Sequence, residues 1–224
     1  MGSFITMTMS DGADVAVYRA GPVGERRGGL VLVQEIFGVN AHIRAVADDY
    51  AAEGYEVLAP ALFDREHPGF EVGYDADGMA AGLALSRERH PLESSIADVG
   101  ACIDALKHQG PVFIAGYCYG GSVVWYAAAR FDALAAASAY YGRLIPEAAD
   151  LRPKCPTIAH FGRNDAGIPL EGVEMVIAAG HRNVEVFLYD AGHGFNCDAR
   201  ADYDPASAAL AKARTLVLFR ANGG

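Results

Sequence analysis

Long apolar runs and clusters of positive charge are both missing from this 224-residue sequence. No stretch approaches the roughly 20 apolar residues of a membrane-spanning helix, and the N-terminus lacks a basic segment followed by an apolar one. Lysine and arginine number 18 against 28 aspartates and glutamates, which gives a net charge of -10. Proteins that bind nucleic acid or anionic membranes concentrate positive charge. We therefore expect a cytoplasmic protein with neither of these partners.

Cysteine pairs are also missing. The four cysteines form no C-x-x-C pair, which argues against a zinc knuckle or a redox dithiol. The histidines provide no H-x-x-x-H or H-E-x-x-H pattern. We therefore expect reduced thiols, no metal and no cofactor. The cysteines are Cys102, Cys118, Cys155 and Cys197.

What the sequence does contain is a regular alternation of short apolar strands and helical patterns, without repeats or linkers. With 52% hydrophobic and 21% charged residues, the composition is that of a globular protein. The alternation predicts an α/β fold, a single domain over 1–224 with a mostly parallel sheet covered by helices on both faces. An antiparallel hairpin is expected at the N-terminus. Expected strands cover 4–9, 15–18, 30–34, 55–59, 113–117, 134–141, 157–161 and 184–189, and expected helices cover 41–53, 76–88, 92–108, 119–130, 170–179 and 205–219.

The least regular segment spans residues 61–91, which carry charges, Pro68 and several glycines. An excursion of this kind between core strands commonly covers an active site. A plain surface insertion fits the composition equally well.

The most informative motif is a cysteine between glycines, where an apolar strand meets a helical pattern. Gly116-x-Cys118-x-Gly120-Gly121 has the spacing of the G-x-S-x-G nucleophile elbow, with sulfur in place of oxygen. Such a turn places the thiol at a helix N-terminus, whose partial positive charge favours a thiolate. The alternative is a small buried core cysteine. The glycines favour the nucleophile.

A base and an orienting acid follow the cysteine in the order that α/β-hydrolases use. Asp165 ends a turn after the expected strand 157–161, and His193 lies in a glycine-flanked loop after 184–189. Both positions are at the carboxyl ends of strands, where open α/β sheets hold their chemistry. Asp190 is a rival acid, but it is beside the histidine and follows no strand of its own. We therefore predict a Cys118–His193–Asp165 triad.

Together, several motifs resemble the dienelactone hydrolase family (carboxymethylenebutenolidases). The resemblance runs nearly end to end and implies the same triad on a compact α/β-hydrolase fold. The matching segments are 34–38 (QEIFG), 116–121 (GYCYGG), 162–165 (GRND), 191–195 (AGHGF) and the closing stretch 203–216.

The resemblance also implies a role for Glu35, which in the family helps to switch the protonation of the nucleophile. A permanent thiolate is open to oxidation, and a nearby carboxylate opposes thiolate formation through charge repulsion. If substrate moves that carboxylate, it can take the thiol proton. The alternative for Glu35 is a capping or solvated residue at a strand end.

The expected reaction is hydrolysis of a lactone or carboxylic ester through a thioester on Cys118. The backbone N–H groups of Ile36 and Tyr119 are the expected oxyanion hole. Candidate substrate contacts are Phe37, Arg87, Phe195 and Arg200, although the two phenylalanines fit the core equally well. Family members that grip a carboxylate use an arginine shortly after the histidine, where this chain has Asn196-Cys197-Asp198 before Arg200. Arg89, Arg143 and Arg163 are further candidates.

Two other functions remain open on these residues. One is a small-molecule-binding or thiol-reactive sensor that keeps the elbow but turns over poorly. The other is a structural module with an inert Cys118. The sequence predicts neither the physiological substrate nor the oligomeric state.

Overall fold

The computed structural model describes all 224 residues and contains one eight-stranded sheet in the order β1-β2-β4-β3-β5-β6-β7-β8. β1 and β2 form an antiparallel hairpin, β2 pairs antiparallel with β4, and every other pairing is parallel. This arrangement confirms the predicted fold class. The strands are β1 (Ser3–Thr8), β2 (Asp14–Ala20), β3 (Gly28–Val33), β4 (Tyr55–Pro60), β5 (Val112–Tyr117), β6 (Leu134–Tyr140), β7 (Thr157–Gly162) and β8 (Val184–Tyr189).

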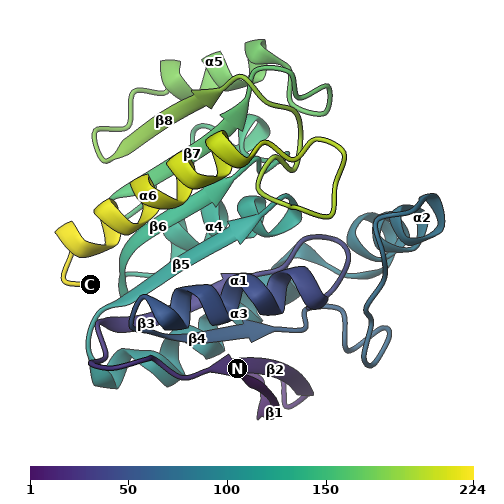
Figure 1. The fold of residues 1–224 in the computed structure, drawn as a ribbon, viewed down its shortest axis with the longest axis vertical. Coiled ribbons are helices and arrows are strands. Elements are labelled where there is room, and N and C mark those ends of the chain that lie inside the picture. Colours follow the sequence, from purple (N-terminus) through teal and green to yellow (C-terminus); the bar gives the residue numbers. More distant parts are fainter.

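Helices cover both faces of the sheet. Figure 1 shows α1 and α6 on the near face and α3 and α4 behind it. α1 packs on β4, α6 on β6 and β7, and α4 on β5 and β6. The helices are α1 (Ala41–Ala52), α2 (Ala76–Ala84), α3 (Leu92–Leu106), α4 (Tyr119–Arg130), α5 (Leu170–Ala178) and α6 (Pro205–Ala221), with short turns η1 (Leu85–Arg89), η2 (Lys107–Gln109) and η3 (Pro146–Ala148).

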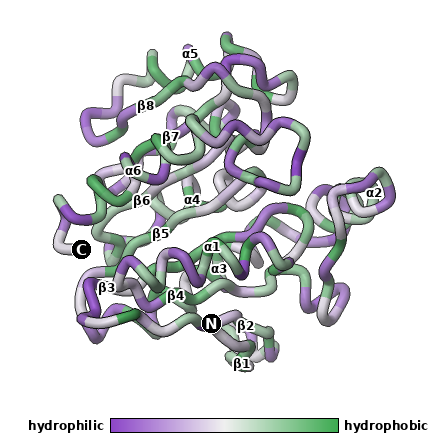
Figure 2. Tube along the Cα trace, in the orientation of Figure 1, coloured by the Kyte–Doolittle hydropathy of each residue, from purple (hydrophilic) through white to green (hydrophobic).

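The core lies on the central strands. Every residue of β3, β4, β5 and β7 is buried, as the continuous apolar runs predict for strands covered on both faces. Figure 2 shows the hydrophobic stretch along β5 and alternating hydrophilic and hydrophobic positions along α1. The edge strand β1 is largely exposed. None of the helices combines the length and the apolar character needed to cross a membrane.

Two boundaries differ from the expected ones in a way that matters for the site. The expected helix 76–88 is α2 followed by the π-helical turn η1, so the helix widens where it approaches the sheet. β6 ends at Tyr140, one residue earlier than expected, and Tyr141 directly after it takes a left-handed φ of 38°. Figure 1 shows α2 beyond the carboxyl ends of the parallel strands.

Candidate active site

The turn between β5 and α4 has the geometry of a nucleophile elbow. Cys118 has a φ of 55° and a ψ of -111°, one of only two positive-φ conformations outside glycine. Such strain is held in place by the surrounding structure. A Cβ at Gly120 would lie 2.4 Å from the carbonyl oxygen of Val33, and one at Gly121 would lie 2.2 Å from that of Tyr140. The two glycines are therefore required by the close approach of neighbouring strands.

The side chains of Cys118, His193 and Asp165 meet above the carboxyl edge of the sheet. His193 Nε2 lies 3.1 Å from Cys118 Sγ, and His193 Nδ1 lies 2.6 Å from Asp165 Oδ2. The other carboxylate oxygen of Asp165 accepts the backbone N–H of Gly167 at 2.8 Å. Each carboxylate oxygen of Asp165 therefore has a partner, and the two hydrogen bonds hold the carboxylate toward the imidazole.

The charge of the neighbouring groups keeps a proton on His193. Burial lowers the pKa of the imidazole, but the negative charge of the Cys118 sulfur and the hydrogen bond that Nδ1–H donates to Asp165 outweigh it and raise the pKa to about 10. The rival acid Asp190 is exposed and pairs with Arg163, so it does not reach the histidine.

Tyr141 is a residue of this site that sequence reasoning missed. Its ring packs 5.1 Å from the His193 ring and 5.2 Å from that of Phe195. The left-handed backbone at Tyr141 turns this ring toward the imidazole instead of along the strand. Its position directly after a sheet strand, at the edge that holds Cys118, was the available signal.

The sulfur faces a cavity of about 620 Å³, large enough for a small organic substrate. The segment between β4 and α3 forms one wall through Met79, Leu83, Ser86 and Arg87. Of the two readings of residues 61–91, the structure therefore favours a cover over the site.

Three of the candidate arginines line this cavity: Arg87, Arg143 and Arg200. Phe37 and Phe195, predicted as substrate contacts, do not line it, because both rings are fully buried in the core. Phe37 instead packs on Tyr74, and Phe195 on Tyr141. The two rings thus support Tyr74, which donates to Glu35, and Tyr141, which packs on His193.

Ile36 and Tyr119, the two expected oxyanion donors, line the same cavity as Cys118. Tyr119 is the first residue of α4, and N–H groups in the first turn of a helix have no intrahelical acceptor. The Tyr119 hydroxyl lies 2.9 Å from Ser95 Oγ, which in turn lies 2.9 Å from His90 Nε2. This buried chain fixes the first turn of α4 against α3.

Glu35 lies between the cavity and the body of the sheet, with its side chain only 1% exposed. The Tyr74 hydroxyl donates to Oε2 at 3.1 Å, and Arg200 Nη1 lies 3.6 Å from Oε1. Burial and the charge of Glu35 raise the pKa of Tyr74, which keeps it a donor. Oε1 has no hydrogen-bond partner. In this structure Glu35 is therefore held by Tyr74 and Arg200 and not by the nucleophile.

Comparisons with known proteins agree with this geometry. A sequence profile described as the dienelactone hydrolase family matches residues 15–223. The chain is 35% identical to a carboxymethylenebutenolidase of Pseudomonas sp., over 87% of this chain and 85% of the relative. It is 36% identical to a Synechocystis protein that provisionally carries the same name, over 92% and 91%.

A crystal structure from Klebsiella pneumoniae, provisionally described as a dienelactone hydrolase, superposes with a TM-score of 0.86. That structure is 28% identical and the match covers 98% of each chain. The chain therefore belongs to the dienelactone hydrolase family of α/β-hydrolases.

Proposed function

We propose that this hydrolase cleaves lactone or carboxylic ester bonds through a Cys118–His193–Asp165 triad and a thioester intermediate. The observation that carries the proposal is the pair of contacts made by one imidazole, 3.1 Å to sulfur and 2.6 Å to carboxylate. A nucleophile, its base and the group that orients the base are the three parts that such catalysis needs.

In the acylation half, the Cys118 thiolate attacks the carbonyl carbon and forms a carbon–sulfur bond. The carbonyl oxygen becomes an oxyanion, for which the backbone N–H groups of Ile36 and Tyr119 are the proposed donors. When the carbon–oxygen bond breaks, His193 donates its proton to the leaving oxygen. The high pKa of His193 supports this step, since the proton is already on the imidazole when substrate arrives.

In the second half, the neutral imidazole accepts a proton from water while the water oxygen bonds to the acyl carbon. The carbon–sulfur bond then breaks, which releases the acid and restores the pair of thiolate and imidazolium. Asp165 holds the imidazole in the tautomer that presents Nε2 to the reacting atoms and stabilises its positive charge.

Glu35 is proposed to govern how often the thiolate is present. Its carboxylate is buried, carries one hydrogen bond from Tyr74 and leaves Oε1 without one, so a move toward Cys118 breaks few contacts. Near the sulfur, the carboxylate would oppose a thiolate or take its proton. Arg200 would favour the position away from the sulfur.

The proposed substrate is a small lactone or ester that carries a carboxylate. Arg87, Arg143 and Arg200 bring positive charge to a cavity of about 620 Å³, and an arginine fork matches a carboxylate. Arg200 is partly neutralised by Glu35, which leaves Arg87 and Arg143 as the stronger candidates. The name carboxymethylenebutenolidase, which the relatives carry, also describes action on a lactone with a carboxylate.

The test is a panel of lactones and aryl esters, with and without a carboxylate, assayed with wild type and Cys118→Ala. We expect turnover in wild type, none in Cys118→Ala, and a mass increase equal to the acyl group on Cys118 under rapid quenching. Cys155→Ala is the matched control, because this buried cysteine lies outside the cavity. A burst of one product per chain without further turnover would instead support a thiol-reactive sensor, and equal activity of Cys118→Ala would contradict the proposal.

A further inference from the structure

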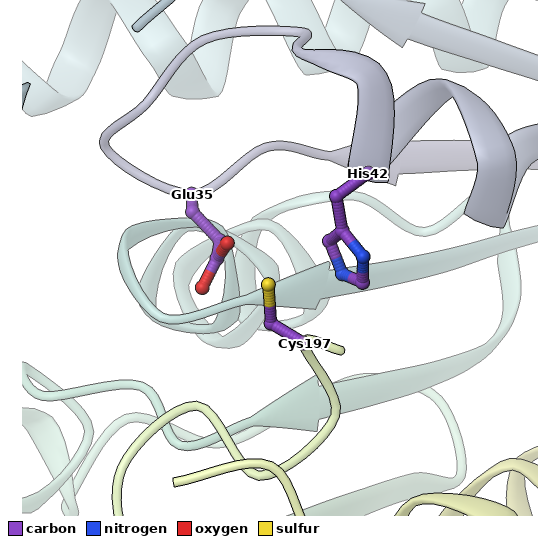
Figure 3. A group of neighbouring side chains, drawn as sticks. All are labelled: Glu35, His42 and Cys197. Carbon is purple, nitrogen blue, oxygen red and sulfur yellow. The ribbon is translucent and has the colours of Figure 1, made fainter. Parts of the chain in front are cut away.

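Three potential metal ligands from distant parts of the sequence meet beside the cavity. Figure 3 shows Glu35 after β3, His42 on α1 and Cys197 in the loop before α6, with their side chains directed at one another. One ligand atom from each side chain lies within 4.8 Å of the other two. The cluster joins a carboxylate, an imidazole and a thiol.

Two polar atoms of these side chains form no hydrogen bond in the protein. His42 Nε2 and Glu35 Oε1 are both buried and form no hydrogen bond. The two side chains are 8% and 1% exposed. A buried polar atom without a partner costs free energy, so two of them in one cluster indicate a missing ligand.

A second carboxylate orients the imidazole. His42 Nδ1 lies 3.1 Å from Asp198 Oδ1, so a proton on Nδ1 leaves the lone pair on Nε2 directed into the cluster. Metal-bound histidines almost always donate their other ring N–H in this way, most often to a carboxylate or a carbonyl. Asp198 follows Cys197 directly in the sequence, so one loop supplies both a ligand and its support.

The charges of the cluster also fit a divalent cation. With the thiol ionised, Glu35, Cys197 and Asp198 carry three negative charges against the one positive charge of Arg200. A divalent ion balances the difference, although it must compete with Arg200 for Oε1.

Among divalent ions, one thiolate and one imidazole favour zinc or its chemical neighbours over calcium or magnesium. Tetrahedral zinc holds such ligands about 2.0–2.3 Å from the metal, and hence roughly 3.3–3.8 Å from one another. The three ligand atoms lie within 4.8 Å of one another, so they need to close by at most about 1.5 Å. The fourth position would be open to water.

Two surface hollows border His42, one of the three residues of the cluster. A hollow of about 500 Å³ and another of about 390 Å³ both border His42 and Asp198. Neither hollow is the cavity that Cys118 faces. An ion can therefore reach the imidazole without entering the substrate cavity.

We propose that Glu35, His42 and Cys197 form an inhibitory binding site for Zn²⁺. Binding releases the thiol proton of Cys197 to solvent and fixes the Glu35 carboxylate on the metal. Glu35 then cannot move between the nucleophile and Arg200, so the switching step slows. This inhibitory consequence rests on the proposed hydrolase function, whereas the metal site itself does not.

The binding test uses Co²⁺ as a spectroscopic substitute for zinc, in the Cys118→Ala protein. That substitution removes the other thiol that has a histidine and a carboxylate beside it. We expect about one Co²⁺ per chain, with a thiolate-to-cobalt absorption band that Zn²⁺ bleaches. A further Cys197→Ala or His42→Ala change should remove the band, whereas Cys155→Ala should leave it.

A graded variant separates a metal site from nonspecific binding. Asp198→Asn keeps the three ligands but weakens the support of His42, so Co²⁺ affinity should fall about tenfold. If no band forms, or if it survives loss of Cys197, the site does not exist. Because these proteins lack the nucleophile, a failure of the hydrolase proposal would not affect this result.

The activity test follows in proteins that retain Cys118. Zn²⁺ should slow hydrolysis in wild type, and the half-inhibitory concentration should rise at least about tenfold in Cys197→Ala and in His42→Ala. Inhibition that is unchanged in both variants would place the inhibitory ion on Cys118 and His193 and overturn the regulatory part of the proposal.

Discussion

The His193–Asp165 pair and the Glu35 carboxylate differ in how completely their polar atoms are paired. On the His193 side, both ring nitrogens and both carboxylate oxygens of Asp165 have partners at 3.1 Å or less. On the Glu35 side, Oε1 has no hydrogen bond and its nearest charge is Arg200 at 3.6 Å. We infer that His193 and Asp165 stay in place during the proposed reaction, whereas the Glu35 carboxylate can move and control it.

The physical basis of this difference is the cost of moving a buried polar group. A side chain whose hydrogen bonds are all formed loses them when it rotates, so the His193–Asp165 pair stays in place. A carboxylate with an unpaired oxygen loses less, and new partners can compensate it. An unpaired oxygen such as Glu35 Oε1 is therefore expected in a carboxylate that changes position, and not in a catalytic group that stays fixed.

The largest effect is expected from a substitution in the His193–Asp165 pair. Asp165→Asn keeps the shape of the side chain but cannot stabilise the imidazolium, and it favours the wrong tautomer of His193. We expect kcat for ester hydrolysis to fall roughly 10,000-fold, as measured by steady-state kinetics. Asp190→Asn is the matched control and should leave kcat unchanged, because Asp190 pairs with Arg163 at the surface. A comparable loss in both variants would remove Asp165 from the proposed mechanism.

A smaller effect is expected from a substitution of Glu35, whose Oε1 has no hydrogen bond. Glu35→Gln retains an acceptor for Tyr74 but removes the charge and the ability to take a proton. We expect turnover to fall about 100-fold with the fold intact by circular dichroism. The exposed Glu185 offers a control, since Glu185→Gln leaves the cavity untouched. Unchanged turnover in Glu35→Gln would show that the unpaired carboxylate has no switching role.

The smallest effect is expected from His160, a buried histidine of the core whose ring nitrogens also have partners. His160 on β7 is fully buried, 2.8 Å from the Tyr189 hydroxyl and 3.2 Å from Ser138 Oγ. Burial, with a smaller contribution from Arg214, lowers the pKa of His160 from 6.5 to about 3. The unfolded chain therefore binds a proton as the pH falls through 6.5, while the folded protein does not.

This shift has a defined sign for stability. The contribution of a neutral His160 is present above pH 6.5 and is lost as the pH falls toward about 3. In that range, the free energy of unfolding of wild type should fall more steeply than that of His160→Gln, by up to about 1.4 kcal/mol per pH unit. Urea unfolding at several pH values gives this slope, and parallel curves for the two proteins would show that His160 accepts a proton in the folded state.

Most of the secondary structure could be predicted, because the central strands are buried on both faces and therefore read as continuous apolar runs. The predicted helix 119–130 and strand 184–189 match α4 and β8. That Cys118, Asp165 and His193 lie close together could be predicted, because each follows its own strand. Phe37 and Phe195 were wrong as substrate contacts, since an apolar ring beside a catalytic motif fits the cavity wall and the core equally well.

Other features depend on segments that the sequence does not connect. Tyr141 reaches His193 through a left-handed turn that its own neighbours do not signal. Arg87 reaches the cavity because η1 bends toward it. The cluster of Glu35, His42 and Cys197 joins the segment after β3 to the loop before α6. No local spacing in the sequence therefore predicts it.

The sequence by itself determined the layered sheet and the sharp turn at Cys118, and it placed Cys118, Asp165 and His193 each after a strand, because strand burial and tight turns act through near neighbours. Only the tertiary structure decided which arginines face the substrate, which aromatic rings are core, and which polar atoms remain unpaired. Those properties depend on distances between segments far apart in the chain, and packing fixes such distances only after the sheet has assembled.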